Sequence, residues 1–355
     1  MTALDRTAAV RQGESIDVNA VVTYLKDKIS DIEGPVSLRQ FPRGFSNLTY
    51  LITIGDRELV LRRPPFGKKA KTAHDMHREY RILSALKPVF PHVPLPLTYC
   101  DDPAIMDAPF YVMERLQGVI LRKQLPESSA FNADWADRLC RRWVAVLGEL
   151  HGLDYRECGL GDLGRPEGYM TRQVHGWSHR YRNARTEDVP DFESVMTWLD
   201  KNMPNRPARP ALIHNDYKFD NVILDPGDPT RIIGVLDWEM ATVGDPLMDL
   251  GASLGYWVEA GDSDELKLVR TLPTLSPGMW TRRQIVAHYA ETTGTAVEDF
   301  AWNYCFGLFR LAVIAQQIYY RFYHGQTTDK RFSVLGIAVG ILEKAAVRVM
   351  ATGTY

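Results

Sequence analysis

The chain has 355 residues, with 42 Lys and Arg against 44 Asp and Glu and a formal net charge of −2 at pH 7. A chain of this length can bury a large core and forms one large domain or two lobes. The near balance of charges excludes a global basic field that would hold nucleic acid or an anionic membrane by bulk charge, so we expect neither partner. No feature of the sequence predicts an obligate protein partner.

The cysteines and the N-terminus limit the cellular setting. The four cysteines, Cys100, Cys140, Cys158 and Cys305, are far apart and form no C-x-x-C pair. This spacing argues against a zinc site or a disulfide framework and favours reduced thiols in the cytoplasm. Residues 1–15 mix acidic and basic side chains without an apolar core, which predicts a frayed tail rather than a signal peptide.

The first part of the chain predicts one helix and a small sheet. In residues 16–29, apolar side chains recur at helical spacing after a polar cap. The pattern then changes to three short β-like segments, residues 36–41, 49–54 and 58–63, separated by turn residues. These segments predict a three-stranded antiparallel meander.

The next elements are a helix, a connection and a further strand. Residues 73–86 predict a helix, and the proline-dense residues 87–100 predict an irregular connection between lobes. Residues 109–116 then predict an apolar strand, and Gly118 marks a change of region.

The remainder is mainly helical. Residues 132–150 and 281–350 show helical periodicity, whereas residues 206–237 return to loops and short strands. Residues 304–320 are the most apolar long stretch, but they include an arginine and two glutamines, so we predict a buried helix rather than a membrane span.

These elements predict an α+β protein with two lobes. A tail and helix at 1–34 precede a small β-rich lobe with a hinge at 35–117. A larger, mainly helical lobe at 118–355 is expected to carry the catalytic loop, the metal site and the acceptor pocket.

The sequence HNDYKFDN at 214–221 lies between two apolar segments, ALI and VIL, that read as buried strands. A polar loop held between buried strands is a frequent place for chemistry. Its spacing H-x-D-x-x-x-x-N is what phosphoryl transfer requires of a catalytic loop. Asp216 would orient or deprotonate an attacking hydroxyl, and Asn221 would hold a magnesium ion.

A second carboxylate stands in register with this loop. Asp237 ends the apolar strand IIGVLD, sixteen residues after Asn221, where a metal-binding aspartate would follow the catalytic loop of a kinase. One carboxylate and one amide form a hard oxygen site that leaves Mg²⁺ open to phosphate and water.

The upstream half should supply contacts to a nucleotide. Strand alternation favours Arg62 over its rival Arg63 as the phosphate-binding cation, with Glu79 as the ion-pair partner of Arg62. Arginine stands where kinases have lysine, and it would grip phosphate through two donors. A loop with a single glycine offers Ser46 and Asn47 as further phosphate contacts.

Taken together, these segments resemble the aminoglycoside phosphotransferase-like branch of the protein-kinase fold, and most closely the phosphotransferases associated with acyl-CoA dehydrogenases. The resemblance runs from residue 38 to residue 322. Its broad motifs are HNDYKFDN, VLDWE and GDPLMDL, while LRRPP, GYMTRQ and FRLAVIAQQ point to the acyl-CoA dehydrogenase-linked branch.

The resemblance implies a bilobal protein-kinase-like fold and a kinase that uses ATP and Mg²⁺. It makes Asp216 the catalytic aspartate and assigns the hinge that meets adenine to Met113, Glu114 and Leu116. Asp249 would brace the catalytic loop by accepting its backbone N–H groups. The acceptor would be a small-molecule hydroxyl, with a hydroxyacyl-CoA favoured and an aminoglycoside, a choline-like alcohol or a sugar left open.

Other interpretations stay open at this point. The chain could be a nucleotide-binding pseudokinase that has lost turnover, or a protein kinase, although no activation segment follows Asp237. Asn215 replaces the arginine of regulated kinases, so we expect constitutive activity. His214 is expected to be a scaffold residue. One face of the 304–320 helix, with Arg310 and Gln316, either packs in the core or lines the acceptor pocket.

Overall fold

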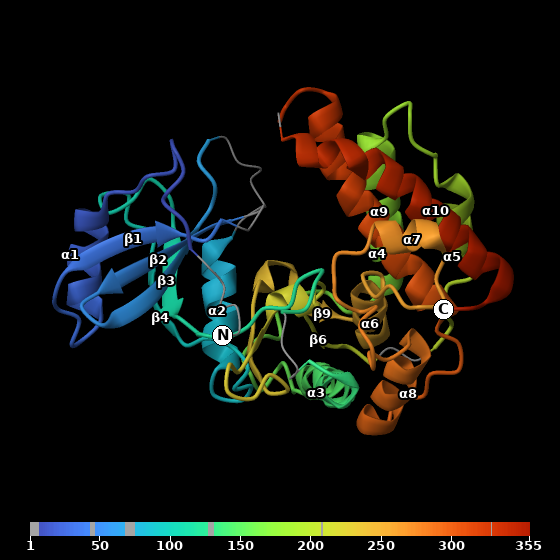
Figure 1. Ribbon diagram of the computed structural model, residues 1–355, viewed down its shortest axis with the longest axis horizontal. Helices are drawn as coiled ribbons and strands as arrows, with labels where there is room; N and C mark the ends of the chain where they lie inside the picture. Colours follow the sequence, from blue (N-terminus) through green and yellow to red (C-terminus); the bar gives the residue numbers. More distant parts are fainter. Residues whose placement is uncertain (1–6, 43–46, 68–74, 127–130, 207–208, 328) are drawn as a thin grey trace. The chain divides into compact units, whose positions relative to one another are not determined.

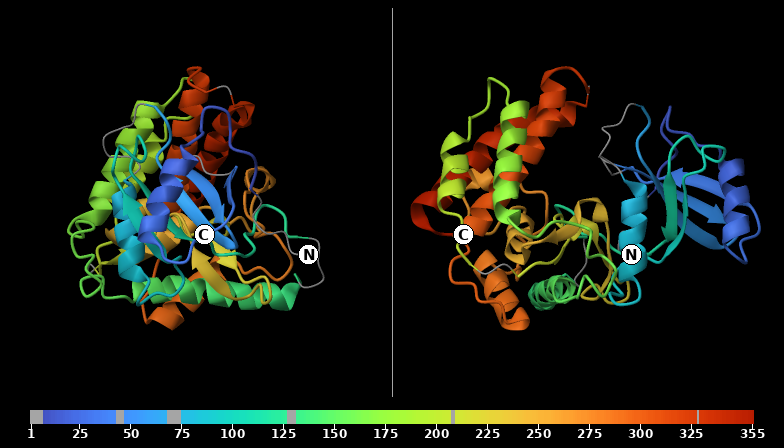
Figure 2. Two further views of the ribbon diagram at one scale, coloured as in Figure 1. Left: turned by 90° about the vertical axis from the view of Figure 1, so that its left-hand side faces the viewer. Right: turned by 180° about the vertical axis from the view of Figure 1, so that it is seen from behind.

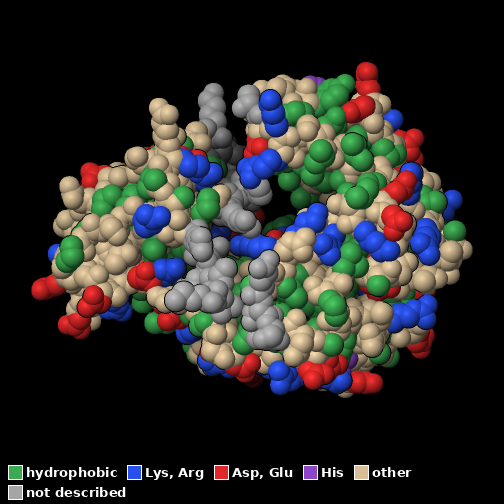
Figure 3. Space-filling model, in the orientation of Figure 1, with side chains coloured by type: hydrophobic (Ala, Val, Ile, Leu, Met, Phe, Trp, Pro, Cys, Tyr) green, Lys and Arg blue, Asp and Glu red, His purple; other side chains and the backbone are tan. Residues whose placement is uncertain are grey.

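The structure is a computed structural model that describes residues 7–42, 47–67, 75–126, 131–206, 209–327 and 329–355. The chain divides into two compact units (Figure 1). The first unit comprises Met1–Ile120 with Asn221–Glu239, and the second comprises Leu121–Asp220 with Met240–Tyr355. On the face shown in Figure 3, Lys and Arg side chains are interspersed with Asp and Glu, as the balanced composition predicts.

The first unit is built on a five-stranded antiparallel sheet with the order β1-β2-β3-β5-β4. The strands are β1 Val36–Gln40, β2 Leu48–Ile54, β3 Arg57–Arg63, β4 Pro96–Cys100 and β5 Phe110–Glu114. The predicted meander β1-β2-β3 is confirmed. The β2–β3 turn needs glycine at Gly55, where φ is +57° and a Cβ atom would lie 2.3 Å from the carbonyl oxygen of Glu33.

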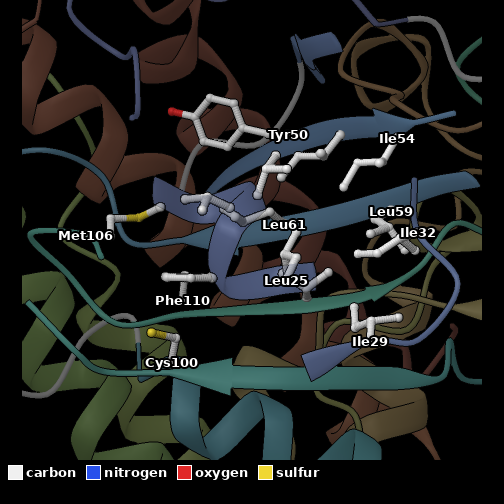
Figure 4. Packing of buried hydrophobic residues seen from close by; sticks show 14 of the residues in the cluster. Leu25, Ile29, Ile32, Tyr50, Ile54, Leu59, Leu61, Cys100, Met106 and Phe110 are labelled. Carbon is white, nitrogen blue, oxygen red and sulfur yellow. The ribbon is translucent and has the colours of Figure 1, made fainter. Parts of the chain in front are cut away.

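Two helices belong to this unit, α1 Val18–Lys28 and α2 Met76–Leu86. The side chains of Asp17 and Asp75 cap them by accepting backbone N–H groups of the first turn. Leu25 of α1 lies in the core with strand residues such as Leu61, as Figure 4 shows. Burial of such a side chain contributes about 1.5–3 kcal/mol.

Residues 87–100 are not entirely irregular, contrary to the prediction, because they contain β4. The strand starts at Pro96 and lies at the edge of the sheet, next to β5. A proline is tolerated at the first residue of an edge strand because no ladder hydrogen bond is lost there. The proline density therefore concealed a strand in this connection.

The N-terminal segment is also more ordered than predicted in its described part. Ala8 exchanges two backbone hydrogen bonds with Gln40 of β1, at 2.8 and 2.9 Å. The backbone N–H of Arg11 donates to the side chain of the same glutamine at 2.9 Å. The segment around Ala8 is thus attached to the edge of the sheet at β1.

A short hairpin from the middle of the chain completes the first unit. It consists of β7 Val222–Leu224 and β8 Ile232–Val235, paired antiparallel. Val119 and Leu224 exchange backbone hydrogen bonds of 2.8 Å, which tie the hairpin to the segment after β5. This hairpin had been assigned to the helical lobe on sequence alone, since nothing local in a short apolar run indicates its tertiary partner.

The second unit is mainly helical. Its helices are α3 Ala133–His151, α4 Tyr169–Ala184, α5 Glu193–Lys201, α6 Pro246–Leu254, α7 Asp264–Leu268, α8 Arg282–Thr293, α9 Ala301–Tyr323 and α10 Leu335–Thr352. Two short strands, β6 Ala211–Ile213 and β9 Thr242–Gly244, pair antiparallel. Among the described residues, short 3₁₀ helices lie at Lys330–Val334 in this unit, and at Phe219–Asn221 and Trp238–Met240, where the chain passes from one unit to the other.

Helix α9 is the buried helix predicted from residues 304–320, and it packs beside α4, α6 and α10 (Figures 1 and 2). Glycines allow α6 and α9 to cross closely, since a Cβ atom on Gly307 would lie 2.0 Å from the carbonyl oxygen of Gly251. Across the described residues, no helix is long and apolar enough to cross a membrane.

Candidate active site

The catalytic-loop sequence follows β6 in the second unit. Asn215 has a positive φ of 64°, a conformation that asparagine tolerates better than most residues. Asp249 of α6 is fully buried, and its carboxylate accepts the backbone N–H groups of His214 at 2.8 Å and Asn215 at 2.7 Å. It also lies 3.1 Å from Nε2 of His151. Asp249 therefore fixes the backbone immediately before Asp216.

The surroundings of Asp249 favour its ionised form. Burial alone would raise its pKa, but the hydrogen bond and charge of His151 and the groups of His214 hold the pKa below its ordinary value. The native state is thus stabilised by an ionised Asp249 at any pH above the ordinary carboxyl range. This contribution is lost as the pH falls through the lower, folded-state pKa.

Asp249→Asn is expected to destabilise the fold by about 3 kcal/mol at pH 7, because an amide cannot accept both backbone N–H groups. Stability should also depend less on pH in the variant than in the wild type below about pH 4. Urea unfolding across pH values tests both effects. The matched control is Asp264→Asn, whose carboxylate is fully exposed at the start of α7; an equal loss in the control would contradict the bracing role.

His214 is fully buried, and its Nδ1 accepts the backbone N–H of Asp216 at 3.2 Å. An imidazole that accepts through Nδ1 carries its proton on Nε2. The histidine therefore holds the backbone of the loop around Asp216.

Lys218 was not singled out from the sequence. Its Nζ lies 2.8 and 2.7 Å from the two carboxylate oxygens of Asp216 and 4.6 Å from the ring centre of Tyr256. Burial opposes its charge, yet Tyr256, Asp216 and Asp220 raise the pKa of Lys218 above its ordinary value, so the ammonium stays charged. The available signal was the D-x-K spacing inside HNDYKFDN, which places a cation beside the predicted base.

In the first unit, strand alternation orients Arg62 as the sequence predicts. Its Nη2 lies 2.9 Å from Oδ1 of Asp237 and 3.5 Å from Oε2 of Glu79. Arg63 points to the opposite face, where it pairs with Asp107 at 3.0 Å and stacks on Phe66. The rival assignment to Arg63 is thereby disfavoured.

The ion pairs of Arg62 are well shielded from solvent. Glu79 is 1% exposed, and its carboxylate also accepts Nδ2 of Asn47 at 3.0 Å and the hydroxyl of Tyr111 at 2.9 Å. Burial opposes the charge of Arg62, but Glu79 and the other nearby acidic groups raise its pKa above the ordinary value. Arg62 is therefore a fixed positive charge.

The hairpin β7–β8 brings the two predicted metal ligands to one end. Val222 pairs with Val235, and the backbone N–H of Leu236 donates to the carbonyl of Asn221 at 2.8 Å. Asn221 and Asp237 consequently flank the same end of the hairpin. Asp237 has a positive φ of 69°, a strained conformation of the kind that is retained at functional sites.

The donor set at this end fits a magnesium ion. An amide and a carboxylate supply oxygen ligands, which Mg²⁺ prefers. In the part of the chain that the structure describes, no three His, Cys, Asp or Glu side chains group as a closed metal cage. An open set of this kind suits a metal that takes its remaining ligands from phosphate and water.

Glu239 is a second residue that sequence reasoning missed. Its Oε2 accepts Nδ2 of Asn47 at 3.0 Å, and its backbone carbonyl accepts Nη1 of Arg78 at 2.9 Å. Asn47 thus bridges Glu79 and Glu239, so its amide group organises this acidic corner. The signal lay in the sequence DWE, where Glu239 is two residues after Asp237.

Some of the other predicted nucleotide contacts lie in or near β5, and others lie outside the described residues. Met113 and Glu114 end β5, and Glu114 accepts Nζ of Lys87 at 3.0 Å. The side chain of Leu116 lies against Gly234 of β8, where a Cβ atom would come within 2.5 Å. Ser46 lies outside the described residues, as does Gly44.

Gln316 packs in the core, which is one of the two interpretations of its helix face. It is fully buried and donates to the carbonyl of Ala184 at 2.8 Å and to Thr186 at 3.2 Å. Arg310, on the same helix, instead donates to the carbonyl of Asn215 at 2.5 Å. The core-packing interpretation thus holds for Gln316.

Comparison with known proteins agrees with the motifs. The pattern of the phosphotransferase enzyme family matches residues 37–283. Acyl-CoA dehydrogenase family member 10 of Mus musculus is 34% identical over 327 residues, which cover 91% of this chain and 30% of the mouse protein. The chain therefore spans less than a third of that relative's length.

Solved structures share the fold. The crystal structure of a Ralstonia eutropha protein, described as a putative aminoglycoside phosphotransferase, matches with a TM-score of 0.80 at 26% identity, over 95% of this chain and 99% of that one. An aminoglycoside phosphotransferase in complex with AMP-PNP and hygromycin B matches with a TM-score of 0.60 at 17% identity, over 95% of this chain and all of that one. The chain belongs to the phosphotransferase enzyme family and has its bilobal, protein-kinase-like fold.

Proposed function

We propose that this chain is a kinase that uses ATP and Mg²⁺ to phosphorylate a hydroxyl group of a small molecule, and that the acceptor is a hydroxyacyl-CoA. The observation that carries the proposal is the catalytic loop of the second unit, in which Asp249 fixes the backbone and Lys218 pairs with Asp216. A carboxylate held in place by a fixed cation suits the orientation of an acceptor hydroxyl, and the cation would stabilise negative charge that builds up on the phosphate.

The residues of each unit have roles of their own. In the second unit, Asp216 orients the acceptor hydroxyl and takes its proton, and Lys218 sets the position of the carboxylate. In the first unit, Asn221 and Asp237 would hold Mg²⁺, which supplies neutralisation of phosphate charge when bound. Arg62 is the cation that orients the nucleotide, with Glu79 fixing its guanidinium.

The hinge and the phosphate-contact segment are part of the same proposal. Met113, Glu114 and Leu116 would meet adenine at the end of β5, as the family resemblance implies. Ser46 and Asn47 would support the phosphates. A pseudokinase is disfavoured, because Asp216, Asn221 and Asp237 are all retained.

Arg62→Lys is expected to lower kcat/KM for ATP by about tenfold, because an ammonium cannot reproduce the planar, two-sided contact of a guanidinium. Steady-state kinetics with varied ATP measure the change. The control is Arg63→Lys on the opposite face of the same strand, which should leave kcat/KM for ATP within about twofold. Equal activity of Arg62→Lys and wild type would remove Arg62 from the nucleotide site.

The acceptor is inferred from the relatives, which are named as acyl-CoA dehydrogenase family members. The test compares a hydroxyacyl-CoA with the acyl-CoA of equal length that lacks the hydroxyl. We expect ADP release in the presence of Mg²⁺ and the hydroxyacyl-CoA, and only background release with the second compound or with EDTA. Turnover of aminoglycosides, choline-like alcohols or sugars in place of the hydroxyacyl-CoA would overturn the acceptor assignment and leave the kinase assignment standing.

A further inference from the structure

Two arginines in the second unit contact one tryptophan near the catalytic loop. Trp177 of α4 is 6% exposed, and its ring centre lies 5.1 Å from Cζ of Arg310 of α9 and 4.7 Å from Cζ of Arg180 of α4. Helices α4 and α9 pack side by side, as both views of this unit show (Figures 1 and 2). We call these three residues the Arg–Trp cluster.

Arg310 differs from the other buried arginines of the described residues in its lack of a neighbouring carboxylate. Four arginines are buried in the described part of the chain, and three of them, Arg62, Arg63 and Arg282, form ion pairs with carboxylates. Arg310 is 2% exposed, and no carboxylate of a described residue lies within 4.0 Å of its guanidinium. Burying a cation without an opposite charge is costly in free energy, whereas a buried cation that lies next to an anion is tolerated.

The guanidinium of Arg180 adds a second positive charge beside Trp177. Arg180 has no carboxylate within 4.0 Å among the residues that the structure places. Partial loss of hydration around its guanidinium, and next the positive charge of Arg310, hold the pKa of Arg180 below its ordinary value, although the residue as a whole is exposed. Two like charges on one aromatic ring repel each other, and an anion between or beside them would relieve that repulsion.

The Arg–Trp cluster adjoins the proposed base within the same unit. Nη2 of Arg310 donates to the carbonyl of Asn215 at 2.5 Å, and Asn215 immediately precedes Asp216. Lys218 is a third cationic side chain in this region, where it pairs with Asp216 and lies over Tyr256. A molecule whose hydroxyl meets Asp216 would therefore lie close to the cationic side chains of Arg310 and Lys218.

We propose that the Arg–Trp cluster binds an anionic group of the acceptor, a carboxylate or a phosphate, and so selects anionic alcohols over neutral and cationic ones. This inference rests on the proposed function, because it assigns a ligand to the same acceptor site. Trp177 holds the two guanidiniums by stacking, and their forked donors match the paired oxygens of carboxylate or phosphate. A polycationic aminoglycoside would be repelled.

The decisive variant is Arg180→Gln, since Arg180 is exposed and its described contact is with the Trp177 ring, whereas Arg310 also holds the catalytic loop. Three acceptors identify the source of the anion: a free hydroxy acid, a hydroxyacyl-CoA, and the matching hydroxyacyl-pantetheine, which lacks the phosphates. The matched control is Arg182→Gln on the same helix, where the arginine pairs with Glu193.

We expect Arg180→Gln to raise KM for the anionic acceptor about tenfold or more, with kcat and KM for ATP within about twofold of wild type. A rise with hydroxyacyl-CoA but not with the pantetheine form assigns a phosphate, and a rise with the free hydroxy acid assigns a carboxylate. The inference is overturned if KM for every acceptor is unchanged, or if Arg182→Gln has the same effect. Turnover restricted to neutral or cationic alcohols also overturns it, together with the hydroxyacyl-CoA assignment, while the kinase assignment stands.

A second measurement keeps the inference testable without turnover. Calorimetric titration with inorganic phosphate, in the presence of ADP and Mg²⁺, should show weaker binding to Arg180→Gln than to wild type or Arg182→Gln. Equal phosphate affinity of all three proteins would overturn the inference, whereas failure of every acceptor to be phosphorylated would count against the proposed function alone.

Discussion

Asp216→Ala is expected to lower kcat by about a thousandfold or more, because the acceptor hydroxyl loses the group that orients it and takes its proton. The dissociation constant for Mg²⁺-nucleotide should stay within about twofold of wild type, since the nucleotide and metal ligands are assigned to other residues. Steady-state kinetics and calorimetric titration with Mg²⁺-ADP measure the two quantities separately.

Asp216→Ala also removes the ion-pair partner of Lys218, so a second variant is needed as a control. Removal of the carboxylate leaves the buried ammonium of Lys218 without the oxygens that lie 2.8 and 2.7 Å away. Asp216→Asn keeps one oxygen and the shape of the side chain, so it should fold like the wild type and still lack transfer. Retained transfer in Asp216→Asn would contradict the role of Asp216 as the proton acceptor.

Asp237→Asn is expected to weaken Mg²⁺-dependent nucleotide binding by about a hundredfold, because the proposed site loses its carboxylate ligand. Asparagine is preferable to alanine here, since Asp237 has φ of +69° and asparagine tolerates this conformation. Titration with ADP in Mg²⁺ and in EDTA separates the metal contribution. We expect Mg²⁺ to strengthen binding to wild type and to have little effect on the variant.

The two substitutions together test the division of roles between the units. Asp216 belongs to the unit that contains α6 and α9, whereas Asp237 belongs to the unit that contains the five-stranded sheet. We expect loss of transfer with normal binding in the first variant and loss of both in the second. The same losses of transfer and of binding in both variants would contradict the assignment.

Much of the fold followed from local patterns. Period-two alternation in ELVLRR predicted the strand β3 and also which arginine faces Glu79, because alternate residues of a strand point to opposite faces. Helical periodicity predicted α1, α3 and α9, and the polar cap of α1 was predicted as well. These features depend on neighbours in the sequence.

Features that depend on distant parts of the chain escaped prediction. β4 was hidden in a proline-dense stretch, because its place at the edge of the sheet is set by pairing with β5. The bridge between Ala8 and Gln40 joins segments that no local pattern connects. Arg310 gave no sign that its partner would be the carbonyl of Asn215.

The candidate site was predictable in part, because some of its residues belong to a motif with fixed spacing. Asp216, Asn221 and Asp237 could be proposed from the sequence because phosphoryl transfer fixes the residue types and their spacing. Lys218 was overlooked although it lies inside the motif, since a lysine in a polar loop is usually solvated. Its contact with both oxygens of Asp216 becomes evident only when the loop is folded.

The most direct test is mass spectrometry of acceptors incubated with the protein, ATP and Mg²⁺. The panel should contain hydroxyacyl-CoAs, hydroxy acids, sugars, amino alcohols and aminoglycosides, with Asp216→Ala as the blank. We predict the gain of one phosphoryl group on a hydroxyl-bearing member of the panel, absent from the blank and from reactions with EDTA. Intact ATP and unmodified acceptors throughout, with a folded protein that binds nucleotide, would contradict the kinase assignment and indicate a pseudokinase.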